Sequence, residues 1–206
     1  MTVVLSDLDG VLVDSHASIM RAWRAWGRRH GIAIGAVEQG RPSGAVVAAL
    51  APHLDPAEES RALDELQARD AGDVVALPGA AELLRAFGPD GVAVVTSCTA
   101  PLAAARLRAA GLKPPPVVVT ADRLRRGKPD PEGYLLAARE LGAEPSECVV
   151  LEDAPAGVAA GRAAGMRVVA LLTTHSRDEL GAADERVGSV AEWLARRPLY
   201  QGSPNR

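Results

Sequence analysis

The chain has 206 residues, of which 48% are apolar but only 3% aromatic, so its core must be built mainly from Ala, Val and Leu. The net charge of −3 provides no basic field that would draw the protein onto nucleic acid or anionic membranes, so the expected partner is a small molecule. A short apolar run ended by an acid opens the chain; we therefore expect no secretory signal and no membrane span, a cytoplasmic location and, by default, a monomer.

Short apolar runs alternate with amphipathic stretches along most of the chain. The short runs are rich in β-branched residues and predict buried strands at residues 3–5, 92–95, 117–119, 148–151 and 168–172. Helical spacing of apolar positions predicts helices at residues 80–87, 101–110, 131–141 and 156–164. This alternation is typical of an α/β fold, with a Rossmann-like, doubly wound parallel sheet as its core.

The strand pattern vanishes between residues 15 and 77. Segments rich in Ala, Arg and Glu replace it, and those at residues 17–30 and 56–69 have helical spacing. Such a helical insertion follows the first strand, at the end of the sheet where ligands of open α/β folds bind, so it is placed to form a lid. We divide the chain into a core of residues 1–14 and 80–197, an α-helical cap of residues 15–79, and a flexible tail of residues 198–206.

The segment DLDGVLVDS, at residues 7–15, directly follows the first predicted strand. Asp7 and Asp9 lie two residues apart, so a looping backbone can point both carboxylates into one cavity, where one attacks and the other handles protons. Gly10 permits the sharp exit that this geometry needs. The alternative is that these acids belong to an ordinary solvated turn, where Asp and Gly are common.

Two further elements carry groups suited to holding a phosphate. Thr96 and Ser97 follow the strand at residues 92–95 and offer hydroxyls at a strand-to-helix turn; the alternative is an ordinary helix N-cap. Lys128 lies in a loop fixed by a glycine and two prolines, where its ammonium can pair with a carboxylate nucleophile and a phosphate. Because the chain has only two lysines and uses Arg almost everywhere else, the alternative of a surface lysine is weakened.

The fourth element is the pair Glu152 and Asp153, which ends the buried run at residues 148–151. With Asp7 and Asp9 it places four carboxylates at one end of the sheet. Crowded like charges raise one another's pKa and destabilise the fold unless a cation lies among them, and hard oxygen ligands favour Mg²⁺. The alternative is that Asp153 caps the helix that follows.

Taken in order, the four elements resemble the haloacid dehalogenase superfamily, in the branch whose helical cap is inserted after the first motif. The resemblance implies that Asp7 is the nucleophile and Asp9 the general acid and base. It further implies that Mg²⁺ is the cofactor. By the same resemblance, the phosphate is bound by Thr96, Ser97 and Lys128. The metal ion is bound by Asp7, by the backbone carbonyl of Asp9 and by Asp153, and Glu152 holds the water shell of the ion.

The chain resembles sugar-phosphate and glycerol-phosphate phosphatases in particular, through Trp23 with Trp26, the GRP segment at residues 40–42 and the TTH segment at residues 173–175. The resemblance implies a small phosphorylated metabolite as substrate, without naming it. Arg41, on the GRP segment of the cap, is the candidate for contact with a polar or anionic group of the substrate; the alternative is a surface arginine. The two tryptophans lie three apart on one helix face and predict packing inside the cap.

Members of the superfamily with other activities differ from this chain at single motif positions. Dehalogenase members lack the second carboxylate of the first motif, so Asp9 argues against dehalogenation. β-Phosphoglucomutases carry a cap histidine at the position that Ile19 fills here, and His16 is out of register, so a phosphosugar mutase is the alternative function. A catalytically silent metal-binding domain is a third reading, which the complete set of acids and lysine disfavours.

Overall fold

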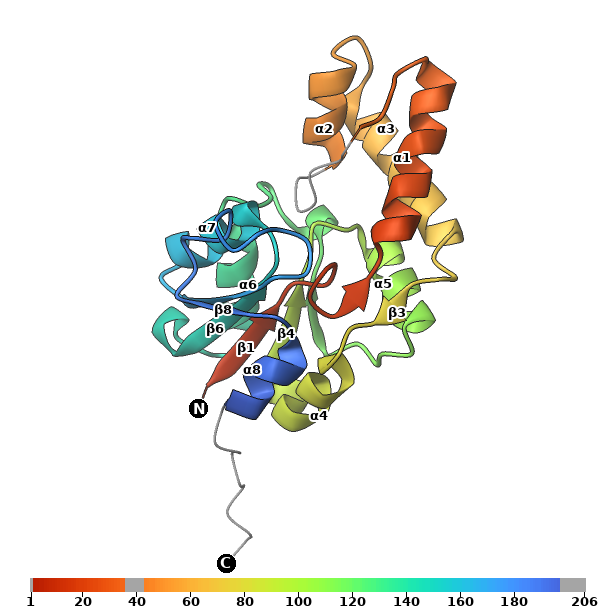
Figure 1. The fold of residues 1–206 in the computed structure, drawn as a ribbon. Helices are drawn as coiled ribbons and strands as arrows, with labels where there is room; N and C mark the ends of the chain where they lie inside the picture. The colour runs from red at the N-terminus through yellow and green to blue at the C-terminus, as the bar shows by residue number, and fades with distance from the viewer. Residues whose placement is uncertain (1, 36–42, 197–206) are drawn as a thin grey trace, which may run out of the picture.

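The computed structural model describes residues 2–35 and 43–196, and its core is a six-stranded parallel sheet (Figure 1). The strands run in the order β5-β4-β1-β6-β7-β8 across the sheet. Their bounds are Val3–Ser6 for β1, Val92–Val95 for β4, Val117–Val119 for β5, Cys148–Glu152 for β6, Arg167–Leu171 for β7 and Glu185–Val187 for β8. All five predicted strands are present. The pattern does not predict β8, because this edge strand has three residues of which only Val187 is buried.

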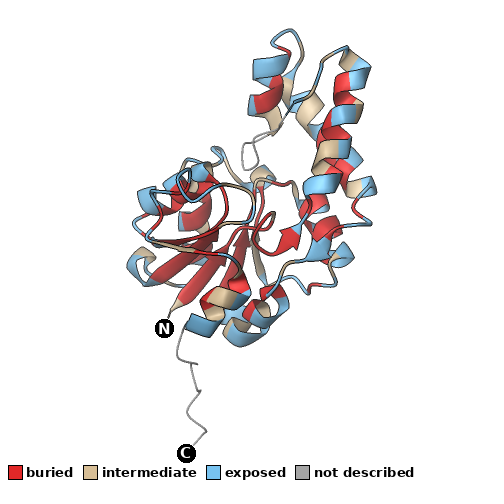
Figure 2. Ribbon diagram, in the orientation of Figure 1, coloured by how far each residue is buried: buried red, intermediate tan, exposed pale blue. Residues whose placement is uncertain are grey.

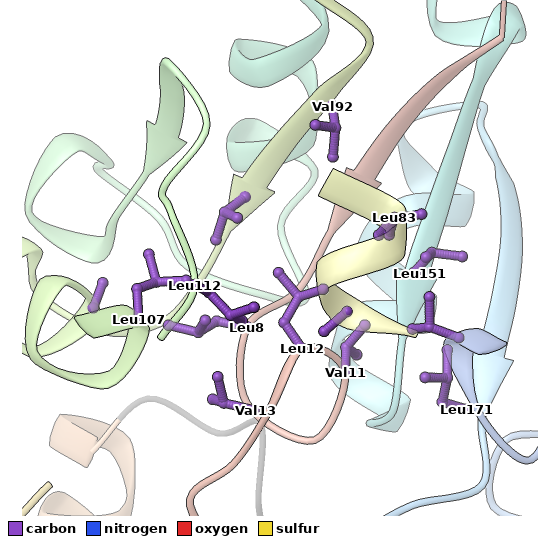
Figure 3. Packing of buried hydrophobic residues seen from close by; sticks show 14 of the residues in the cluster. Leu8, Val11, Leu12, Val13, Leu83, Val92, Leu107, Leu112, Leu151 and Leu171 are labelled. Carbon is purple, nitrogen blue, oxygen red and sulfur yellow. The ribbon is translucent and has the colours of Figure 1, made fainter. Parts of the chain in front are cut away.

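Alternate residues of each strand point to opposite faces of the sheet, and different helices cover the two faces. Val4 packs in one apolar cluster and Leu5 in another, on the opposite face. Figure 2 shows that the strands at the centre of the sheet are buried, and Figure 3 shows side chains of the first cluster, among them Leu83, Leu107 and Leu151. The first cluster is covered by α4 (Ala80–Gly91), α5 (Ala100–Ala109) and α8 (Val190–Arg196), and the second by α6 (Glu132–Glu140) and α7 (Pro155–Ala163). Two 3₁₀ turns, Ala121–Arg123 and Pro145–Glu147, lie in the connections. The doubly wound α/β prediction is therefore confirmed.

The insertion after β1 forms helices that lie beyond the carboxyl ends of the strands (Figure 1). They are α1 (His16–His30), α2 (Ser43–Leu50) and α3 (Pro56–Arg69). Trp23 and Trp26 contact each other edge to face, with ring centroids 5.5 Å apart, and pack in the apolar cluster of the cap as their spacing predicts. Where the chain enters and leaves the cap, β2 (Val13–Asp14) pairs antiparallel with β3 (Val75–Ala76). The inserted helical cap is thus present, and its boundaries at residues 15 and 79 stay a prediction.

Two expectations concern parts of the chain that the structure does not describe. Arg41 of the cap and the tail of residues 198–206 both lie outside the described residues. Within the described ranges, the structure contains no helix that is long and apolar enough to cross a lipid bilayer.

Candidate active site

Three neighbouring strands of the sheet bring the motif residues to one point. Ser6, at the end of β1, lies opposite Val94 of β4 and Leu151 of β6 in the parallel register. Because the carboxyl ends of parallel strands meet at the same edge, the residues that follow these positions converge. Asp7 and Asp153 therefore come together from segments almost 150 residues apart in the chain.

Lys128 links two of the converging acids. Its Nζ donates hydrogen bonds to Asp7 Oδ1 at 2.7 Å, to Glu152 Oε1 at 2.6 Å and to the carbonyl of Val95 at 3.1 Å. Burial alone would lower the pKa of Lys128, but the attraction of Asp7 and Glu152 outweighs it and keeps the pKa well above its usual value. The ammonium is a fixed positive charge between carboxylates, which agrees with the pairing that the sequence predicts.

Glu152 is held on both of its carboxylate oxygens. Oε1 accepts hydrogen bonds from Lys128 and from the hydroxyl of Tyr134 at 2.9 Å. Oε2 accepts from the backbone N–H groups of Asp153 at 2.9 Å and Ala154 at 3.1 Å. The carboxylate also lies over Gly157 at the start of α7, where a Cβ would come within 1.7 Å of Oε1. Glycine at position 157 therefore makes room for this acid.

Asp7 and Asp153 are buried carboxylates with too little positive charge around them. Burial raises the pKa of Asp7 to about 7, although Lys128 opposes the shift. Burial, followed by the repulsion of Glu152 and Asp7, holds the pKa of Asp153 well above its usual range. Ligand oxygens of Asp7, Glu152 and Asp153 all lie within 4.8 Å of one another. When ionised, three buried carboxylates around one ammonium carry an excess of negative charge, and this hard oxygen donor set fits a divalent cation such as Mg²⁺.

The loop after β1 approaches Asp153 closely. Gly10 adopts a φ of 78°, and a Cβ at this position would lie 2.0 Å from Asp153 Oδ2, so both its backbone and its environment require glycine. Thr173, after β7, donates a hydrogen bond to the Gly10 carbonyl at 2.5 Å. Thr174 donates to the carboxylate of Asp153, and His175 Nδ1 lies 2.9 Å from the Asp153 carbonyl oxygen. The TTH segment therefore holds the first motif and Asp153 in place, a role that its sequence did not reveal.

Thr96 and Ser97 lie at the end of β4 next to Lys128. Thr96 is buried, and its Oγ1 accepts a hydrogen bond from the backbone N–H of Cys98 at 3.1 Å, inside the turn that precedes α5. The N-cap residue of α5 is Thr99, so neither Thr96 nor Ser97 is the helix N-cap considered as the alternative. A hydroxyl that accepts still has its own hydrogen to donate. Ser97 is half-buried and lines, with Thr96 and Lys128, a cavity of about 180 Å³. Both hydroxyls are therefore near the predicted phosphate position, and their contact with phosphate stays a prediction.

Asp9 is held by Ser15, from its own segment of residues 7–15, and by two residues outside the motifs. Its Oδ1 accepts a hydrogen bond from Ser15 at 2.6 Å. Its Oδ2 accepts one from the guanidinium of Arg106 at 2.5 Å and one from the thiol of Cys98 at 3.1 Å. Sequence reasoning missed Arg106. A usable signal existed, because a charged residue at position 106 falls on the apolar face of the predicted helix, between Ala103 and Leu107.

Comparison with known proteins agrees with this geometry. A family model for haloacid dehalogenase-like hydrolases matches residues 1–165. Hexitol phosphatase A of Escherichia coli is 44% identical over 188 residues, which cover 87% of each chain. Glycerol-1-phosphate phosphohydrolase 2 of Saccharomyces cerevisiae is 32% identical over 198 residues, covering 87% of this chain and 78% of the yeast protein. A crystal structure of a hydrolase from Pseudomonas syringae matches with a TM-score of 0.84 and 29% identity, over 95% of this chain and 97% of the other. The chain therefore belongs to the haloacid dehalogenase-like hydrolases.

Proposed function

We propose that this hydrolase is a Mg²⁺-dependent phosphatase that acts on a small phosphorylated polyol or sugar through an aspartyl-phosphate on Asp7. The observation that carries the proposal is the contact between Asp7 and Lys128 inside a buried cluster with Glu152 and Asp153. Hexitol phosphatase A and glycerol-1-phosphate phosphohydrolase 2 are both named for phosphates of polyols, which supports this substrate class.

In the proposed reaction Asp7 and Asp9 divide the work. A carboxylate oxygen of Asp7 attacks the phosphorus, the bond from phosphorus to the substrate oxygen breaks, and Asp9 gives that oxygen a proton. Asp9 then takes a proton from a water molecule that attacks the same phosphorus, and the bond to Asp7 breaks. Phosphate is released, and both carboxyl groups return to their starting states. Lys128, Thr96 and Ser97 hold the oxygens of the phosphoryl group in both steps.

The proposed Mg²⁺ site uses the side chains of Asp7 and Asp153 and the backbone carbonyl of Asp9. Glu152, whose carboxylate is fixed by Lys128 and Tyr134, would support the site through the water molecules of the ion. When bound, Mg²⁺ neutralises charge on the transferring phosphoryl group. Arg41 keeps its proposed role as a substrate contact of the cap.

The phosphosugar mutase is the alternative function, and the cap argues against it. Ile19 occupies the position of the mutase histidine, and its side chain packs against the apolar cluster of the cap. An aliphatic side chain has no proton to exchange with a sugar hydroxyl.

A substrate panel with and without metal tests the proposed function. We expect phosphate release from hexitol, glycerol or sugar phosphates in Mg²⁺, little release from nucleoside monophosphates, and none with excess chelator. Isomerisation of a sugar 1-phosphate in the presence of its bisphosphate, without net phosphate release, would contradict the proposal and favour the mutase.

Metal removal is expected to change the stability of the protein and its dependence on pH. The pKa of Asp7 is about 7 in the folded, metal-free protein and 3.8 for an ordinary Asp, the value taken for the unfolded chain. Between these two pH values the folded state therefore holds a proton that the unfolded state has released. The free energy of unfolding should therefore fall as pH rises from about 4 to about 7. The difference between wild type and Asp7→Asn, measured by urea unfolding in chelator at each pH, isolates this contribution.

Mg²⁺ should restore the stability that the metal-free protein loses as pH rises, because the ion binds the ionised carboxylates of the folded state. At a concentration about 100 times its Kd, the ion adds about 2.7 kcal/mol, which raises the Tm of a chain of this size by about 5–10 °C. Asp153→Asn should abolish most of this gain, whereas Asp178→Asn, an exposed acid, should keep it. An equal gain in all three proteins would place the ion elsewhere.

A further inference from the structure

Arg106 is a buried charge at the centre of a network that joins the core to the cap. The residue lies on α5, and only 2% of its surface is exposed. One guanidinium nitrogen, Nη1, donates to Asp9 Oδ2 at 2.5 Å, and the other, Nη2, donates to Gln67 Oε1 at 2.6 Å. Asp9 belongs to the core and Gln67 to α3 of the cap. A single side chain therefore contacts both parts of the protein.

A position of this kind normally carries an apolar residue. Neighbours of Arg106 on the same helix, Leu102 and Leu107, pack in the first apolar cluster, on the face of the sheet that α4, α5 and α8 cover. Burying a guanidinium costs several kcal/mol unless charged and hydrogen-bonding partners surround it. In this case the Nε atom has no hydrogen-bond partner among the described residues, so the partners do not satisfy the group fully. Arg108, two residues further along the helix, is exposed, so its guanidinium stays in water and has no cost of burial.

The electrostatic environment of Arg106 is built by acids from both sides. Burial alone would lower its pKa, but the attraction of Asp9 and, more weakly, of Asp64 outweighs burial and raises it. Asp64 of α3 is itself buried, and its Oδ2 accepts a hydrogen bond from the backbone N–H of Thr99 at 3.3 Å, just before α5 begins. The contact between α3 and α5 thus includes two buried polar residues of the cap, Asp64 and Gln67.

We propose that Arg106 is a positioning residue that orients the carboxyl group of Asp9 for proton transfer, and that its bond to Gln67 ties this orientation to the seating of the cap. The inference rests on the acid and base role proposed for Asp9. Ser15 holds Oδ1 and Arg106 holds Oδ2, so the plane of the carboxyl group is fixed from two directions. A small displacement of a proton donor costs much of its effect, because proton transfer requires hydrogen-bond distance to the leaving oxygen.

Substrates with different leaving groups separate this role from a structural one. The alkoxide of a polyol leaves poorly and needs a proton from Asp9, whereas p-nitrophenolate is stable and leaves without one. Under single-turnover conditions, with enzyme in excess, release of nitrophenolate reports the first transfer to Asp7 alone. A residue that acts through Asp9 should therefore affect the two substrates unequally.

The test compares Arg106→Met with Arg108→Met on glycerol phosphate and on p-nitrophenyl phosphate. For Arg106→Met we expect the single-turnover rate on glycerol phosphate to fall about 100-fold, in the range typical of lost acid catalysis, and the nitrophenolate rate to change less than about 3-fold. Arg108→Met, which removes the same charge from the exposed side of α5, should leave both rates unchanged. An equal loss on both substrates would show a structural role and overturn the proposal.

Three further variants guard against failure to fold and against failure of the proposed function. Gln67→Leu keeps the contact between Arg106 and Asp9 but removes the hydrogen bond to the cap, and we expect its rate on glycerol phosphate to fall about 10-fold while its nitrophenolate rate is kept. Arg106→Lys keeps the charge but not the fork of donors. If both Gln67→Leu and Arg106→Lys affect the two substrates equally, the inference is overturned. Asp9→Asn provides the reference. If Asp9→Asn lowers the rates on the two substrates equally, the acid role of Asp9 is wrong. If Asp9→Asn lowers the glycerol phosphate rate more than the nitrophenolate rate but the Arg106 variants lower both rates equally, only the positioning role of Arg106 is wrong.

Discussion

Asp7→Asn abolishes phosphate release, by about 10⁴-fold or more, because the amide is not a nucleophile and the first bond to phosphorus cannot form. The substitution conserves shape, and it removes a carboxylate whose burial the fold tolerates poorly. We therefore expect the metal-free variant to be at least as stable as wild type at pH 7. The measurement is phosphate release under saturating substrate, together with the midpoint of urea unfolding.

The control for this change is Asp178→Asn, the same substitution at an exposed acid. Its activity should remain within about 2-fold of wild type, since surface substitutions away from a site rarely matter. Residual activity of Asp7→Asn above about 1% of wild type would contradict a covalent role for Asp7. It would favour direct attack by water on the substrate.

Lys128→Met lowers both activity and stability. Removing one partner of a buried ion pair leaves an uncompensated charge, and this typically costs about 3–5 kcal/mol of unfolding free energy. Here two carboxylates, those of Asp7 and Glu152, lose their shared partner. Loss of a fixed positive charge beside the phosphoryl group should also lower kcat by about 10²-fold to 10³-fold. Urea unfolding in chelator and steady-state kinetics in Mg²⁺ measure the two effects.

The chain supplies a matched control, because its one other lysine, Lys113, is exposed. Lys113→Met should change neither property beyond about 0.5 kcal/mol or 2-fold. Adding Glu152→Gln to Lys128→Met should recover part of the lost stability, since the second change removes one of the unpaired charges. Equal stability of Lys128→Met and Lys113→Met would contradict the ion-pair account.

Much of the core could be predicted because its signals are local. Continuous runs of Val mark the central strands, and glycines with positive φ angles, at positions 111, 142 and 165, directly follow the ends of α5, α6 and α7. The motif acids also follow from local sequence, because parallel strands must deliver their carboxyl ends to one edge. The edge strand β8 escaped prediction, since only one of its three side chains is buried and no apolar run marks it.

The supporting residues of the site could not be predicted from motifs, because their roles depend on which helix faces turn toward the acids. Tyr134 on α6 and Arg106 on α5 each reach a motif carboxylate from a different layer of the fold. Sequence periodicity places Arg106 on a buried face but does not reveal that Asp9 and Gln67 meet there. Thr174 is similar, since its partner Asp153 is 21 residues away in the chain and on another strand end.

The most direct test of the central claim is to trap the phosphorylated enzyme. Wild-type protein is mixed with substrate and Mg²⁺, quenched within milliseconds, reduced with borohydride and digested for peptide mass spectrometry. Borohydride converts an aspartyl-phosphate to homoserine, so we expect homoserine at position 7 in wild type and unmodified peptide when substrate is omitted. Absence of homoserine at position 7 while phosphate is being released, or its presence at another residue, would contradict Asp7 as the nucleophile.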